Sequence, residues 1–164
     1  MPLDWYALVT KPNHEKAVFE YLKAASREAL LPLYRARRRW SDRYKEIELP
    51  LFPGYVFARF SFRQRVPILR VPGVRTIVST GPDPAPIPQA EIDALEAMVR
   101  SGLPVKPWPF LKVGQRVEVV SGPLKGVQGI LLEFKKAWHI VMSVELLQRS
   151  VAVEIDRDSL SPRN

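Results

Sequence analysis

The densest group of side chains able to do chemistry is a run of basic residues in the first third of the chain. Five arginines and one lysine lie within eleven residues: Arg35, Arg37, Arg38, Arg39, Arg43 and Lys45. A guanidinium binds phosphate oxygens in pairs, so the run predicts a nucleic-acid contact that weakens with salt. In a strand, alternation places Arg35, Arg37 and Arg39 on one face. Trp40 and Tyr44 are neighbours able to stack on unpaired bases. The alternative is a solvated hairpin tip.

A second group consists of three aromatic residues around a Pro-Gly pair. Phe52 precedes Pro53, and Tyr55 and Phe57 follow it within a β-rich stretch. A Phe-Pro-Gly turn can hold rings at the surface, where aromatic side chains anchor protein partners. Alternation would place Tyr55 and Phe57 on the same face of the strand. The alternative is that the rings are part of the core.

A third, smaller group lies near the N-terminus, where an expected strand gives way to an expected helix. Lys11, His14 and Lys16 surround this junction. Backbone amides at a helix start, together with lysines, suit a phosphate group. The alternative is a solvated helix end.

Catalytic and metal-binding chemistry finds no support. The chain has no cysteine and only two histidines, His14 and His139, which excludes a disulfide framework and makes a histidine metal site improbable. Acidic residues are dispersed, no Ser-His arrangement is recognisable, and no glycine-rich loop ends in Lys-Ser or Lys-Thr. We therefore expect a protein that is not an enzyme and needs no cofactor.

Composition and charge narrow the class of partner. The 164 residues include 25 Lys+Arg against 17 Asp+Glu, a net charge of +8, which favours a polyanionic partner. No apolar run approaches the ~18 residues of a membrane span, and the N-terminus lacks the pattern of a signal peptide. We expect a cytoplasmic monomer without a membrane contact.

Residues 1–100 show a mixed pattern of strands and helices. Trp5 and Tyr6 open the first strand and are expected in the core, and Asn13 is the expected cap of the first helix. The expected order is β-α-β-β-β-α, an α+β fold with helices packed on an antiparallel sheet. The expected elements are strands or extended segments at 4–10, 30–40, 44–49, 56–60 and 75–79, with helices after Asn13 and over 89–102.

Residues 101–109 hold three prolines and a glycine, which excludes a helix interior or a central strand and predicts a linker. After it, residues 110–164 alternate apolar and polar positions with no helical period. Four or five strands in so short a segment can close into a small barrel.

Three stretches carry a resemblance to a known family. Trp5-Tyr6 with the helix that follows, and Leu49–Phe60 (LPLFPGYVFARF), resemble the N-terminal domain of the NusG family. Val113–Leu131 (VGQRVEVVSGPLKGVQGIL) resembles the KOW motif that follows this domain. Their order and spacing cover nearly the whole chain.

The resemblance implies a transcription elongation factor. The N-terminal domain would bind the clamp helices of the largest RNA polymerase subunit through Phe52, Pro53, Tyr55 and Phe57, and would suppress pausing. Lys11, His14 and Lys16 match the region that faces the non-template DNA strand in RfaH-like proteins.

The KOW domain would be a five-stranded SH3-like barrel that recruits termination factor Rho or, through a small-subunit protein, the ribosome. Leu146 and Leu147 fall where NusG exposes an aromatic residue to such partners, and one of the two leucines is expected in the core. The residues expected to shape its loops and strands are Gly114, Gly122, Pro123, Gly126 and Gly129.

The sequence is more similar to specialised NusG paralogues, of the RfaH and UpxY/LoaP type, than to general NusG. Leu51–Phe57, the Pro86-Ile87-Pro88 segment and the tail Ser143–Asp156 carry this similarity. It implies antitermination at specific operons. Two alternatives stay open: a general NusG with Rho-linked termination, and a KOW-type protein that binds the ribosome or RNA.

Overall fold

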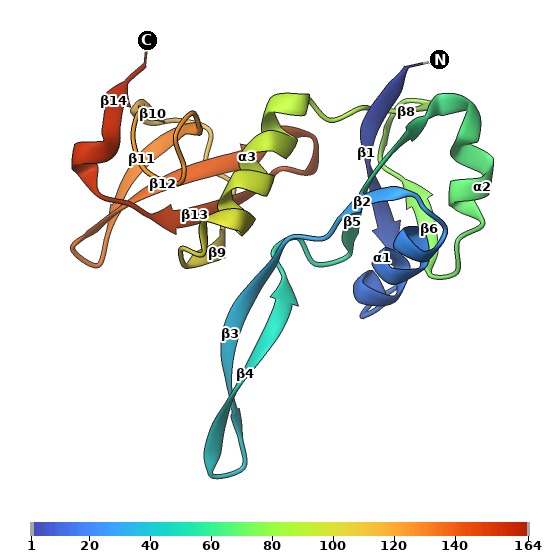
Figure 1. Ribbon diagram of the computed structural model, residues 1–164, viewed down its shortest axis with the longest axis horizontal. Coiled ribbons are helices and arrows are strands. Elements are labelled where there is room, and N and C mark those ends of the chain that lie inside the picture. The colour runs from blue at the N-terminus through green and yellow to red at the C-terminus, as the bar shows by residue number, and fades with distance from the viewer. Residues whose placement is uncertain (1, 164) are drawn as a thin grey trace. The chain divides into compact units, whose positions relative to one another are not determined.

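The computed structural model describes residues 2–163 of the chain, and its elements are antiparallel sheets and helices (Figure 1). The chain divides into two compact units. The first comprises the residues up to Leu33 together with Phe52–Gln89; the second comprises Tyr34–Leu51 and the residues from Ala90 onward. The expected α+β class is confirmed.

The first unit is built on a four-stranded antiparallel sheet in the order β2-β5-β1-β6. The central strand β1 pairs with β5 so that Val9 faces Tyr55, and with β6 on its other side. The strands are β1 (Leu3–Thr10), β2 (Glu28–Leu30), β5 (Tyr55–Ser61) and β6 (Val74–Ile77), followed by the short pair β7 (Ser79–Thr80) and β8 (Asp83–Pro84). The strands expected at 4–10, 56–60 and 75–79 thus correspond to β1, β5 and β6.

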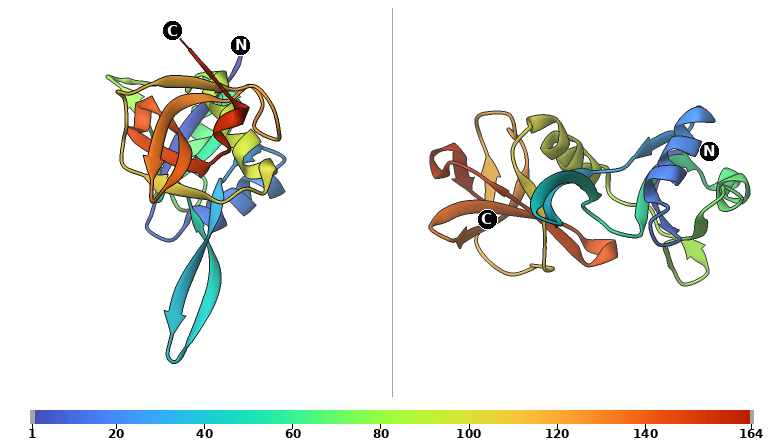
Figure 2. Two further views of the ribbon diagram at one scale, coloured as in Figure 1. Left: turned by 90° about the vertical axis from the view of Figure 1, so that its left-hand side faces the viewer. Right: turned by 90° about the horizontal axis from the view of Figure 1, so that it is seen from below.

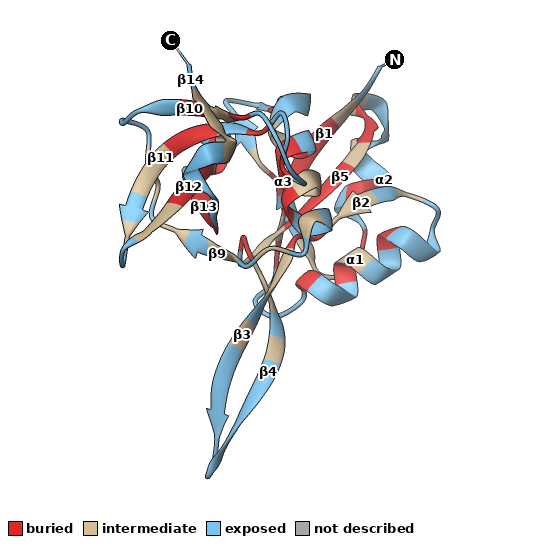
Figure 3. Ribbon diagram, turned by 60° about the vertical axis from the view of Figure 1, so that its left-hand side comes forward, coloured by how far each residue is buried: buried red, intermediate tan, exposed pale blue. Residues whose placement is uncertain are grey.

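One face of this sheet forms the core of the unit. Tyr6 stacks on Phe60 with ring centroids 4.6 Å apart, and both are buried. Val18 and Leu22, one helical turn apart on α1 (Glu15–Ala24), are fully buried in the same cluster. Ile68 of the short helix α2 (Arg65–Leu69) completes it. Figure 3 shows the buried stretches along β1 and β5.

The helix start differs from the expectation. Asn13 does not cap α1, because its backbone takes the left-handed conformation with φ of 64°. His14 occupies the cap position instead, without a side-chain capping bond.

In the second unit, β3 (Leu33–Trp40) and β4 (Arg43–Pro50) form a two-stranded ribbon that twists along its length (Figure 2). Ser41 and Asp42 connect the strands, and the left-handed φ of Ser41 suits a tight hairpin turn. Both extended segments expected here are therefore strands. The ribbon is mostly exposed, as its colouring in Figure 3 shows.

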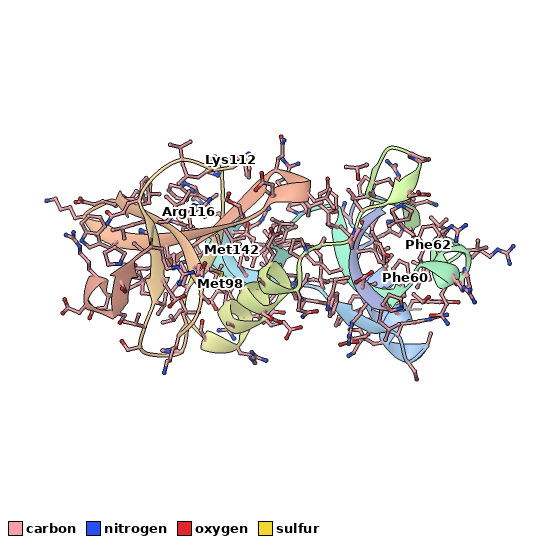
Figure 4. The ribbon with its side chains drawn as sticks, turned by 90° about the horizontal axis from the view of Figure 1, so that it is seen from above. Phe60, Phe62, Met98, Lys112, Arg116 and Met142 are labelled. Atoms are coloured by element: carbon pink, nitrogen blue, oxygen red, sulfur yellow. The ribbon has the colours of Figure 1, made fainter. Side chains whose placement is uncertain are left out.

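The second unit also contains α3 (Gln89–Ser101) and a six-stranded antiparallel sheet in the order β14-β10-β11-β12-β13-β9. Buried Val117 and Val119 alternate in β10, whereas β12 and β13 each bury four consecutive residues, 139–142 and 150–153. Met142, labelled in Figure 4, is one of these buried residues. The strands are β9 (Val105–Trp108), β10 (Arg116–Val119), β11 (Gln128–Phe134), β12 (Ala137–Val144), β13 (Arg149–Glu154) and β14 (Leu160–Pro162).

Part of residues 101–109, the expected linker, is a strand. This strand is β9, which pairs with β13 so that Pro107 faces Val151. Because β9 is the edge strand of the sheet, the amide that Pro107 lacks is not needed by an outer neighbour. This strand raises the number in the sheet from the expected five to six.

Candidate functional site

The Phe52–Tyr55 turn is fixed by three backbone-mediated hydrogen bonds. Within the turn, the Tyr55 amide donates to the Phe52 carbonyl oxygen at 3.0 Å, and Gly54 has the positive φ of 87° that the third position of a type II turn requires. The Thr10 amide at the end of β1 donates to the Gly54 carbonyl oxygen at 2.9 Å. The Gly54 amide donates to Oε2 of Glu15 at 3.0 Å.

Glu15 holds the turn in place, a role that sequence reasoning missed. Its side chain is buried at the start of α1 and links the helix to the turn 39 residues later. An acidic residue in a first helical turn is common, because it complements the helix dipole. Nothing in that local signal reveals the Gly54 amide as its partner.

Two of the expected polymerase-contacting rings lie in the interior. Phe52 is 1% exposed and Phe57 0%, and the rings meet edge to face with centroids 5.4 Å apart. The expectation that these two rings are exposed anchors does not agree with their burial. Pro53 is exposed and Tyr55 is half-buried, so these two residues carry the accessible side chains of the turn.

The junction between β1 and α1 carries its three expected residues at the surface. Lys11, His14 and Lys16 are all exposed. His14 Nδ1 lies 2.9 Å from the Pro12 carbonyl oxygen, and the Lys11 amide donates to the Gly73 carbonyl oxygen at 2.8 Å. The loop is therefore held in place while its side chains face solvent.

The basic run lies on the β3–β4 ribbon, and all its members are exposed. Because Arg35, Arg37 and Arg39 occupy alternate positions in β3, they lie on one face of the strand, as expected. Two cations lie over the ribbon's aromatic rings: Arg37 Cζ is 4.5 Å from the centroid of Tyr44, and Lys45 Nζ is 5.9 Å from that of Trp40.

The KOW-like loop between β10 and β11 contains Gly122, Pro123 and Gly126. The Gly126 amide donates to the Val119 carbonyl oxygen at 2.8 Å, which closes the loop. In β11, a side chain at Gly129 would overlap the Val141 carbonyl oxygen of β12, so the close strand approach expected there is present. Gly114 lies just before β10 against Ile130.

The two leucines expected to contact partners separate. Leu146 is half-buried, whereas Leu147 is 7% exposed and belongs to the barrel core. Both belong to one 3-10 turn, Glu145–Leu147, which turns one side chain inward and leaves the other at the surface. Leu147 is therefore the one of the two leucines that is part of the core, and Leu146 is the one that a partner can reach.

Within residues 2–163, no group of three or more acidic, histidine or cysteine side chains is arranged to hold a metal ion. Among the described helices, none combines the length and apolarity needed to span a membrane. The residues predicted from the sequence lie on the turn, the ribbon, the β1–α1 junction and the barrel loops.

Comparisons with known proteins agree with these features. Residues 3–96 match the family described as "Transcription termination factor nusG". The "Transcription termination/antitermination protein NusG" of Lactococcus lactis subsp. lactis is 26% identical over 165 residues, which cover 93% of this chain and 89% of that protein. Its namesake from Helicobacter pylori is 23% identical over 168 residues, covering 93% and 94%.

Among solved structures, that of Thermotoga maritima NusG, titled "Domain interaction in Thermotoga maritima NusG", has the same fold. The TM-score is 0.61 at 23% identity, covering 100% of this chain and 99% of that one. The family match spans more than half of the 164 residues. The chain therefore belongs to the NusG family of transcription termination and antitermination factors.

Proposed function

We propose that this chain is a transcription elongation and antitermination factor that binds RNA polymerase through Pro53 and Tyr55. The observation that carries the proposal is the hydrogen-bonded turn, which holds an exposed proline and a half-buried tyrosine in one fixed geometry. A rigid aromatic residue loses little conformational entropy on binding, which makes it an effective interface anchor. The clamp helices of the largest polymerase subunit are the proposed partner.

The test is binding of full-length variants to a purified paused elongation complex. We expect Tyr55→Ala to weaken binding by about 2 kcal/mol or more, roughly thirtyfold. The matched control is Tyr21→Ala, which removes an exposed tyrosine from α1 of the same unit. Equal losses from both variants, or no loss from Tyr55→Ala, would place the polymerase contact elsewhere.

The basic residues are proposed to contact nucleic acid. Arg35, Arg37, Arg38 and Arg39 are exposed on the ribbon and would neutralise phosphates without reading bases. Lys11, His14 and Lys16 would contact the non-template DNA strand from the β1–α1 junction. In both cases, the support is the exposure of positive charge on well-defined elements.

The specialised role, antitermination at specific operons, is also proposed. The alternative is the general NusG role with Rho-linked termination, which is supported by relatives named for both termination and antitermination. Single-round transcription with purified polymerase and Rho distinguishes the two roles. We expect the protein to reduce pausing without increasing Rho-dependent release. An increase in Rho-dependent release would identify a general NusG.

The barrel is proposed to bind a small-subunit ribosomal protein or Rho near Leu146. Its half-buried side chain would be the apolar contact, since Leu147 is in the core. Leu146→Ser should reduce partner binding in a pull-down with each purified candidate, while the barrel stays folded. Unchanged capture of both candidates would exclude this contact.

We also propose that the division between polymerase-binding and KOW domains lies within residues 101–104, so that α3 belongs to the polymerase-binding domain although it clusters with the barrel in the second compact unit. The family match ends at residue 96, and the barrel sheet begins at Val105. A fragment starting at residue 103 should give the dispersed amide spectrum of a folded domain. One starting at residue 110 should be less stable, because it lacks β9 and the contact of Trp108 with Phe134. Equal stability of the two fragments would return the boundary to residue 109.

A further inference from the structure

The two faces of the β3–β4 ribbon are not equivalent. Side chains alternate between faces along each strand, and the two cation–ring contacts show which residues of β3 and β4 share a face. We call them the tyrosine face and the tryptophan face. The tyrosine face consists of Arg35, Arg37, Arg39, Tyr44, Glu46 and Glu48. The tryptophan face consists of Ala36, Arg38, Trp40, Arg43, Lys45 and Ile47.

Charge distinguishes the faces. The tryptophan face has three cations, Arg38, Arg43 and Lys45, and no acidic side chain. The tyrosine face has three arginines, but Glu46 and Glu48 lie among them. A polyanion is therefore attracted more strongly to the tryptophan face, although the alternate arginines of β3 alone would favour the other.

The extent to which cations cover the two rings also favours the tryptophan face. The guanidinium of Arg37 lies 4.5 Å from the Tyr44 centroid and covers one side of that ring. Lys45 Nζ is 5.9 Å from the Trp40 centroid, close to the ~6 Å limit of a cation–π contact. Trp40 is also 67% exposed, against 60% for Tyr44. Trp40 thus offers the larger and less occupied ring.

An open indole beside three cations suits a strand whose bases are unpaired. A base stacks on the ring, while phosphates on either side meet the cations. A duplex supplies phosphates but keeps its base faces covered. The tryptophan face also has no acidic, amide or hydroxyl side chain to accept a hydrogen bond from a ribose 2′-hydroxyl, so it gives RNA no advantage.

We propose that the tryptophan face binds an unpaired DNA strand, with one base stacked on Trp40 and phosphates held by Arg38, Arg43 and Lys45. The assignment rests on the proposed nucleic-acid contact of the ribbon and specifies its face and its ligand. It makes Trp40, which is exposed on a polar ribbon, the residue that distinguishes single-stranded from duplex DNA.

The experiment is a fluorescence-anisotropy titration of the full-length protein with a short labelled oligothymidylate. We expect Trp40→Ala to weaken binding roughly 5- to 150-fold, the range for loss of one base–aromatic stack. Tyr44→Ala, the matched control on the opposite face, should change binding less than about threefold on the same basis. With a DNA duplex of equal length, Trp40→Ala should have no comparable effect.

Salt dependence tests the cations separately. Arg38→Gln and Lys45→Gln should each reduce the log–log salt slope for the single strand by about 0.7, the value for one phosphate contact. Arg35→Gln, on the tyrosine face, should reduce the slope for the single strand by less than either of these variants. Equal reductions from both faces would overturn the assignment of the phosphates.

Other outcomes overturn the proposal directly. They are oligothymidylate binding that survives Trp40→Ala, an equal loss from Tyr44→Ala, and binding to oligouridylate more than about tenfold tighter than to oligothymidylate. If Trp40→Ala instead weakened only the polymerase complex, the face would bind a protein. Tyr55→Ala should lose polymerase and keep the oligonucleotide, so failure of the polymerase contact is recognised independently.

Discussion

The Phe52–Tyr55 turn and the β3–β4 ribbon both contain aromatic residues that the sequence indicates as contacts for a macromolecular partner. The exposure of the rings differs between the two regions. Phe52 and Phe57 are buried, whereas Trp40 and Tyr44 stand in solvent. The turn is anchored by hydrogen bonds to two other elements, Thr10 in β1 and Glu15 in α1. The ribbon's rings instead contact cations of the ribbon itself.

This difference shows that an aromatic ring beside a turn is not by itself a surface residue. In β5 residues on both faces are buried. Alternation along this strand therefore decides on which side of the sheet a ring lies, but not whether the ring is exposed. In the ribbon both faces are exposed, so the same alternation separates two solvent-facing surfaces. Both regions carry aromatic rings, but the rings are buried in one region and exposed to solvent in the other.

The largest expected effect tests the burial of the turn's rings. Phe57→Ala should lower the free energy of unfolding by about 3–5 kcal/mol, since it removes a fully buried phenyl group and leaves a cavity. Trp40→Ala should change it by no more than about 0.5 kcal/mol, as expected of an exposed position. Urea denaturation of both variants measures the contrast. A similar loss of unfolding free energy in the two variants would mean that Phe57 does not contribute to the core.

A smaller effect tests the anchoring of the turn. Glu15→Ala should cost about 1.5–3 kcal/mol, because it removes a charge-assisted hydrogen bond and leaves the Gly54 amide without this partner. Glu15→Gln, which keeps an acceptor oxygen, should recover part of the loss. Glu20→Ala, on the exposed side of the same helix, is the control and should be nearly neutral. If the two alanine variants behaved alike in the same denaturation assay, Glu15 would not hold the turn.

Reversing charges on the ribbon should have the smallest effect on stability but a clear effect on DNA binding. The double variant Arg37→Glu/Arg39→Glu should fold normally and weaken duplex DNA binding, with a log–log salt slope shallower by about 0.9 per phosphate contact removed. Recruitment to a paused elongation complex should fall much less, because the turn supplies that contact. Parallel salt titrations of both binding events make the comparison. Equal losses would make the arginines the main docking surface.

Much of the secondary structure was predictable because local signals were strong. Alternating and helical patterns, bounded by proline and glycine, predicted β1, β5 and α3 to within one or two residues of their bounds. Short elements were not predictable in this way: β2 has three residues, and Pro67 interrupts the helical pattern of α2. β9 was read as linker because proline excludes a central strand, and an edge strand is the exception that only the sheet order reveals.

The candidate surfaces were predictable as residues but not as geometry. The Phe-Pro-Gly-Tyr stretch and the arginine run stand out in the sequence because of their unusual residue types. The burial of Phe52, Phe57 and Leu147 depends on layers formed by distant parts of the chain. No pattern along a single strand contains that information.

The sequence by itself determined the periodicity of the chain, its positive charge, the positions of its turns, and the motifs that indicated the family. These properties depend on neighbouring residues, whose preferences are local. The tertiary structure alone decided which rings face solvent, that Glu15 holds Gly54, and that Trp40 shares its face with three cations and no acidic residue. Each of these depends on pairing between strands or on packing between segments far apart in the chain, and the burial and partners of a side chain exist only once those contacts have formed.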